Sequence, residues 1–406
     1  MADVTVLTVL LHDRPIGTLT HVPGDRTLFA FHQDYIDDPA RPTLSLSFKD
    51  IYGQLITDVK PTQTRLPPFF SNLLPESPVR DYLAARAGVN PQREFFLLWA
   101  LGADLPGGMK VRHDQGQPWP DAKDRKTRSA DRSAAPLRFS LAGVQLKFSA
   151  VKKKRGGLTI PADGVGGSWI VKLPDSKFNG VPENEFAMME LARRIGIDVP
   201  ETQLLPIRDI AGLPDDIEQY GPNVFAIRRF DRSDGGDAVH MEDFAQVFGI
   251  YPERKYEAAS YRNIAEVIWI ETGETGVREF IRRFVFNALI GNGDMHVKNW
   301  SLIYPDGRAP ALAPAYDFVA TVPYLRNEKL ALTFVDSKDF SSLTQEQFRR
   351  FAGKAKLPGK LVLDAVEETV QAFAEVWRDV GELGLVNDVR QAIEGHLKTL
   401  PLWKAR

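Results

Sequence analysis

The chain of 406 residues contains no cysteine. It therefore cannot form disulfides, bind an iron–sulfur cluster through thiolates or use thiol catalysis, and this absence fits a reducing, cytoplasmic compartment. The pattern H-E-x-x-H does not occur, and with only seven histidines a zinc site is not favoured. No apolar stretch is long enough to span a bilayer, so we expect no membrane partner.

A large excess of charge of one sign is also missing. The 51 Lys and Arg residues nearly balance the 53 Asp and Glu residues, which gives a net charge of −2. Such a balance provides no general electrostatic surface for nucleic acid, so we expect the chain alone to bind DNA weakly. The 43% of hydrophobic residues is typical of a globular protein, and the length predicts more than one subdomain.

The order of patterns along the chain predicts an α+β protein with two lobes. Residues 1–110 alternate short β-rich runs with turns before becoming helical, which predicts a mixed β/α subdomain built on a small mixed sheet. Residues 111–136 are polar and proline-bearing, as in a linker. Residues 137–235 are rich in strand patterns, and residues 236–406 predict an all-α lobe. This layout is typical of a bilobal protein-kinase-like fold.

The string GNGDMHVKN places Asp294, His296 and Asn299 in the spacing D-x-H-x-x-N of a phosphotransfer catalytic loop. Residues 277–290 before it repeat apolar side chains at helical spacing, and Gly291 favours a helix stop. A buried helix would therefore end at the loop and hold it rigidly. A polar surface turn remains the alternative, because Gly, Asn and Asp are common turn residues.

The string LAPAYDF follows this loop and contains Asp317. Phosphoryl transfer needs a carboxylate that orients the attacking hydroxyl, and it needs oxygen ligands for magnesium on the nucleotide phosphates. Asp294 suits the first role, and Asn299 and Asp317 suit the second. For His296 three roles stay open, namely support of the loop, contact with a nucleotide phosphate and a purely structural role.

Lys172 lies in the apolar strand pattern SWIVKLP, where an ammonium can hold the α- and β-phosphates of a nucleotide. Glu185, on the helix expected at 183–195, could pair with it. No G-x-G-x-x-G precedes Lys172. The string SLAGVQLK is the better candidate for a phosphate loop, because Gly143 lets the backbone approach an anion and Lys147 supplies charge.

Taken in order, the strings SLAGVQLK, IVKLP, NEFAMMELARRIG, RRFDR, GNGDMHVKN and AYDF resemble the HipA toxin serine/threonine kinases. The string LPPFFSNLLPES is similar to part of the N-terminal subdomain of that family. The resemblance covers essentially the whole chain. There are two departures: Arg228 stands where the family typically has an acidic residue, and Val319 replaces the glycine of D-F-G.

The resemblance implies catalytic roles for Asp294, Asn299 and Asp317, with Asn299 and Asp317 as the ligands of Mg²⁺. It implies a hinge at 228–230 that borders adenine, and Ser140 as the serine that such kinases autophosphorylate to inactivate themselves. The residues that it implies for ATP binding are Ala142, Gly143, Val144, Gln145, Leu146, Lys147, Lys172, Arg228, Arg229, Phe230, His296, Val297, Lys298, Asn299, Tyr316 and Asp317.

By the same resemblance we expect an ATP-dependent serine/threonine protein kinase that acts as the toxin of a toxin–antitoxin module. Its substrate would be a component of translation such as an aminoacyl-tRNA synthetase. Its partner would be a dimer of a small DNA-binding, HipB-like antitoxin, through which it would contact DNA indirectly. Two alternatives remain: a small-molecule or lipid phosphotransferase with the same D-x-H-x-x-N loop, and a co-repressor whose kinase site is vestigial.

Overall fold

The structure is a computed structural model. It describes residues 4–77, 79–113, 147–152, 158–159, 167–211, 213, 217–233 and 235–404. Ser140 and residues 142–146 of the expected phosphate loop lie outside the described residues, as does the expected linker from residue 114 onward.

The N-terminal domain is built on a five-stranded sheet in the order β4-β3-β2-β1-β5. Its strands are β1 (Thr5–Leu11), β2 (Arg14–Val22), β3 (Arg26–Phe31), β4 (Thr62–Gln63) and β5 (Met109–His113). Every pair is antiparallel, so the expectation of a mixed sheet is wrong. The reason is local: His12 and Asp13 both have positive φ, as a tight hairpin between β1 and β2 requires.

Short helices complete this domain. They are α1 (Gln33–Ile36), α2 (Pro68–Ser71), α3 (Val79–Ala87) and α4 (Glu94–Leu101). Alternate residues of the strands and the aromatic side chains of α2 and α4 form one buried cluster, in which Leu7, Val9, Phe70 and Phe95 are among the fully buried members. This domain therefore has a hydrophobic core of its own.

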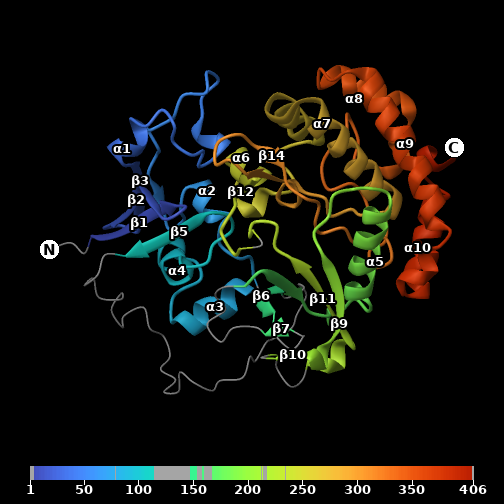
Figure 1. The fold of residues 1–406 in the computed structure, drawn as a ribbon, viewed down its shortest axis with the longest axis horizontal. Helices are drawn as coiled ribbons and strands as arrows, with labels where there is room; N and C mark the ends of the chain where they lie inside the picture. Colours follow the sequence, from blue (N-terminus) through green and yellow to red (C-terminus); the bar gives the residue numbers. More distant parts are fainter. Residues whose placement is uncertain are drawn as a thin grey trace.

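The middle of the chain forms a six-stranded sheet in the order β10-β7-β6-β8-β11-β9. The strands are β6 (Lys147–Lys152), β7 (Leu158–Thr159), β8 (Trp169–Lys172), β9 (Thr202–Pro206), β10 (Ile210–Ala211) and β11 (Asn223–Arg228). Helix α5 (Val181–Arg194) lies beside β9 and β11 (Figure 1). Pro182 stands in its first turn and Gly196, with φ +80°, follows its end, as the sequence predicts.

The C-terminal lobe contains α6 (Phe244–Val247), α7 (Tyr261–Ile290), α8 (Gln345–Lys354), α9 (Gly359–Trp377), α10 (Asn387–Leu397) and α11 (Pro401–Lys404). It also carries a small antiparallel sheet of β12 (His240–Asp243), β13 (Ser301–Tyr304) and β14 (Ala311–Leu312). An all-α lobe was expected, and the sheet is an addition to it. Strands of four and two residues are too short for an alternating pattern to reveal them.

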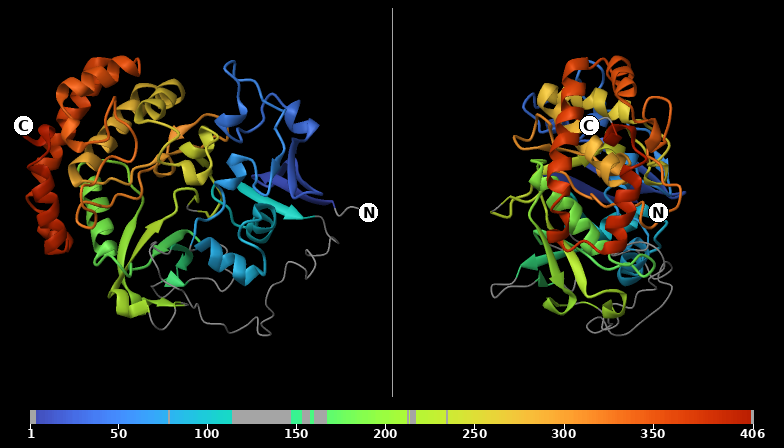
Figure 2. Two further views of the ribbon diagram at one scale, coloured as in Figure 1. Left: turned by 180° about the vertical axis from the view of Figure 1, so that it is seen from behind. Right: turned by 90° about the vertical axis from the view of Figure 1, so that its right-hand side faces the viewer.

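Short 3₁₀ turns lie at Leu46–Phe48, Ile207–Asp209, Ile217–Tyr220, Pro252–Arg254, Val297–Asn299, Phe340–Ser342 and Val380–Leu383. The largest hydrophobic core runs from α5 through α7 to α9. The N-terminal domain and the C-terminal helices lie at opposite ends of the molecule, with the middle sheet and the loops after α7 between them (Figures 1 and 2). Among the described residues, no helix is long and apolar enough to cross a membrane.

Candidate active site

The predicted catalytic loop begins where the buried helix α7 ends. Gly291 closes the helix with φ +68°, and a Cβ at this position would lie 2.6 Å from the side chain of Val322. Only glycine fits both the left-handed backbone and this close approach. The expected helix stop at Gly291 is thus confirmed, and the loop follows a helix whose last eight residues are all buried.

Asn292, which the sequence did not single out, links the segment that carries Asp294 to the segment that carries Asp317. Its side-chain nitrogen donates to Asn287 Oδ1 at 2.7 Å and to the backbone oxygen of Asp317 at 3.3 Å. Its side-chain oxygen accepts the N–H of Asp294 at 2.9 Å. The fully buried amide therefore joins the end of α7 to both proposed catalytic aspartates. In the sequence it resembles an ordinary turn residue between two glycines.

Asp294 lies in the catalytic loop, and its side chain is 48% exposed. Its Oδ1 accepts a hydrogen bond from the hydroxyl of Tyr256 at 2.5 Å. Burial raises the pKa of Asp294, and the bond from Tyr256 opposes that rise. Asn299 donates through Nδ2 to the backbone oxygen of Asp294 at 2.8 Å, and its amide oxygen accepts no hydrogen bond from the described residues.

The lysine cluster consists of Lys172, Glu185 and Asp317. Lys172 is only 7% exposed on β8, and its ammonium forms ion pairs with the carboxylates of Glu185 on α5 and of Asp317. The expected pairing of Lys172 with Glu185 is confirmed. Asp317 has φ +57°, a left-handed conformation that Asp tolerates better than most residues. The cluster thus joins two carboxyl groups to one ammonium.

The charged groups of the lysine cluster shift one another's pKa values. Burial raises the pKa of Glu185 to about 7, although Lys172 opposes this. Burial also acts against the ionised form of Asp317, but Lys172 and Lys147 hold its pKa below the usual range. Lys147 begins β6 and pairs in register with Lys172 of β8. It is therefore placed beside the cluster, and its contact with the phosphates stays a prediction.

His296 is buried between Tyr256 and the loop, with 5% of its surface exposed. Burial lowers its pKa to about 3, so the imidazole is neutral. Its Nε2 lies 4.0 Å from Asp294 Oδ1, and its Nδ1 has no hydrogen-bond partner among the described residues. Within the same described part of the chain, no group of three or more His, Asp or Glu could hold a metal ion by itself.

Three other residues that were expected to bind the nucleotide, Val297, Lys298 and Tyr316, are packed against or hydrogen-bonded to parts of the protein around the catalytic loop. Val297 is fully buried. The ammonium of Lys298 donates to Asp243 Oδ2 at 2.7 Å and to Asn72 Oδ1 at 2.9 Å, and thus reaches the N-terminal domain. The hydroxyl of Tyr316 donates to the backbone oxygen of Lys298 at 2.9 Å. Their contact with nucleotide stays a prediction.

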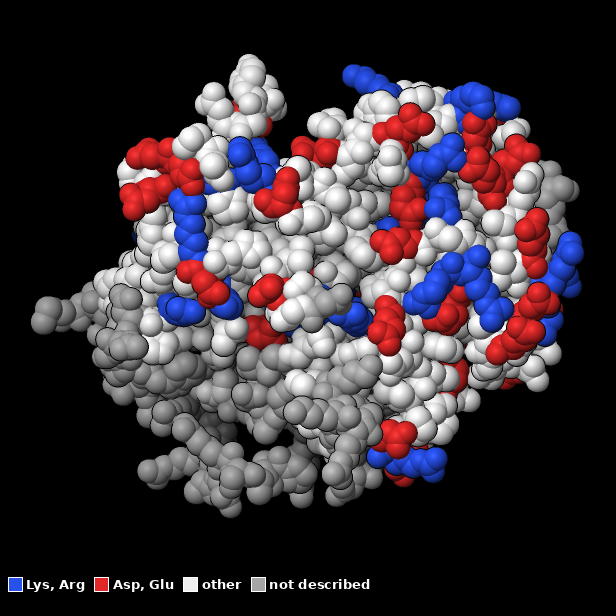
Figure 3. Space-filling view, viewed as in Figure 1, with Lys and Arg blue, Asp and Glu red and all other residues white. Residues whose placement is uncertain are grey.

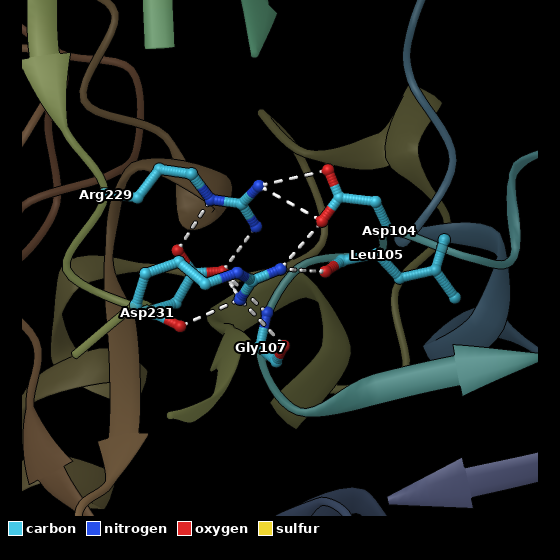
Figure 4. A network of polar contacts seen from close by, with 6 residues as sticks. Asp104, Leu105, Gly107, Arg229 and Asp231 are labelled. Carbon is cyan, nitrogen blue, oxygen red and sulfur yellow. Dashed lines mark hydrogen bonds and ion pairs between the residues drawn. The ribbon is translucent and has the colours of Figure 1, made fainter. Parts of the chain in front are cut away.

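The expected hinge follows β11, where the ring of Phe230 lies 5.5 Å from that of Tyr316. Here the side chain of Arg229 is buried and turned toward the N-terminal domain (Figure 4). Its guanidinium donates to Asp231 Oδ1 at 2.9 Å and Oδ2 at 2.8 Å, and it lies 3.4 Å from Asp104. Any contact of Arg229 with adenine would therefore use its backbone.

Arg232 completes this hinge cluster, which we define as Asp104, Arg229, Asp231 and Arg232. Its guanidinium donates to Asp104 at 2.9 Å and to the carbonyl groups of Leu105 and Gly107. The N–H of Gly107 in turn donates to Asp231 Oδ2 at 2.8 Å. Side chains of the RRFDR string thus fasten the N-terminal domain to the hinge, a role that the sequence analysis did not assign to them.

The fold and the site together define a class. A strand lysine paired with a helix glutamate, followed by a catalytic-loop aspartate and a second aspartate on a helical lobe, is the arrangement of a protein-kinase-like fold. Residues 7–112 match the model of the HipA N-terminal domain, and residues 139–377 match that of the HipA-like C-terminal domain. The chain belongs to the HipA family.

Sequence similarity to known proteins extends over nearly the full length of the chain. A Sinorhizobium fredii protein named "Putative kinase Y4dM" is 53% identical over 408 residues, which span 100% of this chain and 99% of that protein. The "Serine/threonine-protein kinase toxin HipA" of Shewanella oneidensis is 28% identical and covers 93% of this chain, which spans 90% of that toxin.

A solved structure supports the same fold. The complex of Shewanella oneidensis HipA with HipB and operator DNA contains a chain that matches with a TM-score of 0.74 at 21% identity, covering 98% of this chain and 96% of that chain. The likeness extends over both lobes and the N-terminal domain.

Proposed function

We propose that the chain is an ATP-dependent serine/threonine protein kinase that requires Mg²⁺. The observation that carries the proposal is the lysine cluster, which Asn292 connects to the loop bearing Asp294 and Asn299. Positioned charges of this kind are what phosphoryl transfer requires of a protein, because the reaction depends on orientation and electrostatic stabilisation rather than on covalent chemistry.

Each side chain has a definite task in this proposal. Lys172 holds the nucleotide phosphates, and Asp294 orients the acceptor hydroxyl and accepts its proton. Asn299 and Asp317 would hold magnesium, which supplies neutralisation of the phosphate charge. The residues fit that ion, since the amide oxygen of Asn299 and the second carboxylate oxygen of Asp317 make no hydrogen bond with the described residues.

We further propose that the chain is the toxin of a toxin–antitoxin pair. A Shewanella oneidensis relative is named as such a toxin, and a related structure contains HipB and operator DNA. On the face shown in Figure 3, Lys and Arg side chains alternate with Asp and Glu, and the net charge is −2. DNA affinity is therefore assigned mainly to a basic, HipB-like antitoxin dimer. The proposed substrate is a translation protein such as an aminoacyl-tRNA synthetase.

Autophosphorylation of Ser140 is the proposed means of self-inactivation. A phosphoserine adds about −1.5 to −2 charges, and next to a loop that receives ATP phosphates these charges would repel the nucleotide. The proposal assigns residues 142–147 to that loop, with residues 228–230 as the hinge that borders adenine.

The test is incubation of the purified chain with γ-labelled ATP and Mg²⁺, followed by mass spectrometry. We expect label on serine, at Ser140 first, and a transfer rate lower by ~10²–10⁴ in an Asp294→Asn chain. Transfer only to small molecules or lipids would instead favour the alternative phosphotransferase. No transfer to any acceptor would contradict both, and label on the chain with Ser140 unmodified would remove the self-inactivation proposal alone.

A further inference from the structure

Tyr256 contacts the proposed catalytic base directly, although it is far from it in the sequence. It lies between the 3₁₀ turn Pro252–Arg254 and helix α7, and its hydroxyl donates to Asp294 Oδ1 at 2.5 Å. Its ring meets that of His296 edge-on, with the ring centres 5.0 Å apart. Tyr256 therefore touches two of the three residues of the D-x-H-x-x-N spacing.

Among the described residues, only one oxygen of the Asp294 carboxylate accepts a hydrogen bond. Oδ2 of Asp294 makes no hydrogen bond with the described residues, and the side chain is 48% exposed. An acceptor hydroxyl can therefore reach Oδ2 while Tyr256 holds Oδ1. We propose that Tyr256 is a positioning residue that fixes the carboxylate of Asp294 in the orientation needed to receive the acceptor proton. The inference rests on the proposed kinase function.

Tyr256 is itself held on two sides. Its backbone oxygen accepts from the ammonium of Lys338 at 3.1 Å, and that ammonium also donates to the carbonyl group of Ala331 at 2.8 Å. The neighbouring Lys255 pairs with Glu76 of the N-terminal domain at 2.7 Å, and its ammonium lies 5.5 Å from the centre of the Tyr256 ring. A residue anchored in this way can fix the orientation of the Asp294 carboxylate that it contacts.

A second contact ties the same loop to the N-terminal domain. Asn72 donates to the backbone oxygen of Ile250 at 2.7 Å, and its side-chain oxygen accepts from Lys298 of the catalytic loop. One residue of the N-terminal domain thus fixes both the loop that carries Tyr256 and the loop that carries Asp294. The distance between the two partners is set by the fold rather than by the hydrogen bond alone.

The test compares Tyr256→Phe with Tyr251→Phe. Tyr251 is a matched control, because it lies in the same loop, its hydroxyl makes no hydrogen bond with the described residues, and its ring packs against Arg65 at 5.1 Å. Initial rates of labelled phosphate transfer from MgATP to the chain itself and to water are measured over a range of ATP concentrations. We expect Tyr256→Phe to lower kcat about 10-fold with KM for ATP unchanged, because only the orientation of the base is lost.

The control variant should match the wild type in kcat and KM, and all three proteins should share one thermal unfolding midpoint. A wild-type kcat in Tyr256→Phe, an equal loss in Tyr251→Phe, or a rise in KM in place of a fall in kcat would each overturn the inference. Phosphate found on Tyr256 would overturn it too, since Tyr256 would then be an acceptor. A wild-type chain that transfers no phosphate overturns the proposed function and this inference together.

Discussion

The hinge cluster and the lysine cluster are both largely buried groups of charged side chains, and among the described residues they differ in the ratio of basic to acidic groups. In the hinge cluster two arginines meet two aspartates, and each guanidinium makes several hydrogen bonds. In the lysine cluster one ammonium serves two carboxylates. A balanced network repays part of its desolvation cost and holds two parts of a protein together. An unbalanced one keeps an attraction for a further cation.

The protonation behaviour follows the same division. Burial opposes the ionised form of Asp231, yet the two arginines hold its pKa below the usual range. Burial raises the pKa of Glu185 to about 7, and the negative charge of Asp317 adds to this rise while Lys172 opposes it. We therefore propose that the hinge cluster serves stability and the lysine cluster serves binding, since functional sites commonly depart from the best local solution.

The largest expected effect is on the rate of phosphate transfer. It comes from a substitution in the catalytic loop, beside the lysine cluster, that leaves the fold unchanged. Asp294→Asn keeps the shape of the loop but removes the carboxylate that receives the proton. We expect the rate of phosphate transfer to fall by ~10²–10⁴. Transfer rates and thermal unfolding are measured on the same preparation. A variant that unfolds at a much lower temperature, or one that keeps its activity, would contradict this assignment.

The hinge cluster should show the opposite result, a loss of stability. Asp231→Asn removes one of the two carboxylates that Arg229 and Arg232 share, and removing one partner of a buried ion pair costs about 3 kcal/mol of unfolding free energy. Denaturant unfolding is the measurement. Asp13→Asn is the control, because Asp13 pairs with Lys110 and Arg112 at the exposed surface and should contribute far less. Equal losses of unfolding free energy in both variants would show that the hinge cluster contributes no more to stability than an exposed ion pair does.

Removing charge from the lysine cluster should affect metal-dependent binding. Asp317→Asn keeps a residue that tolerates φ +57° while weakening a proposed metal ligand. We expect the affinity for MgATP to fall at least ~10-fold and the affinity for metal-free ATP to change little. Calorimetric titration with and without magnesium measures both. If both affinities fall equally, Asp317 holds the site together without binding metal.

The sequence predicts what is encoded locally. The D-x-H-x-x-N spacing, the helix stop at Gly291 and the apolar strand around Lys172 are patterns within a few residues. Glu185 follows from its place on the next helix, only 13 residues from Lys172. The two-lobed, kinase-like fold is confirmed, whereas the division of the chain at 110, 136 and 235 stays a prediction, as do the nucleotide contacts.

The sequence could not predict contacts between distant segments. Asp104 and Arg232 are separated by 128 positions, Asn72 and Lys298 by 226, and Tyr256 and Asp294 by 38. No periodicity or spacing relates such pairs, because only the tertiary packing of segments distant in the sequence brings them together. The RRFDR string was noticed, but nothing in it shows that Arg229 faces the N-terminal domain rather than a nucleotide.

The smallest expected effect concerns pH and distinguishes the two clusters directly. The pKa of Glu185 is about 7 in the folded chain against a usual value of 4.5. Between these values the folded chain binds a proton that the unfolded chain has released. Protonation of Glu185 therefore stabilises the fold as the pH falls from 7 toward 4.5, and this contribution is lost as the pH rises through 7. It amounts to at most ~1.4 kcal/mol per pH unit.

Asp231 should contribute nothing in the same window, because its pKa is lowered from 3.8 and it is ionised in both states above pH 5. We therefore expect the stability difference between wild type and Glu185→Gln to grow in favour of the wild type as the pH falls from 7.5 to 5.5. The difference between wild type and Asp231→Asn should stay constant. Denaturant unfolding at several pH values measures both differences. Equal slopes would mean that the two clusters have the same protonation behaviour, and that the contrast in charge balance has no energetic consequence.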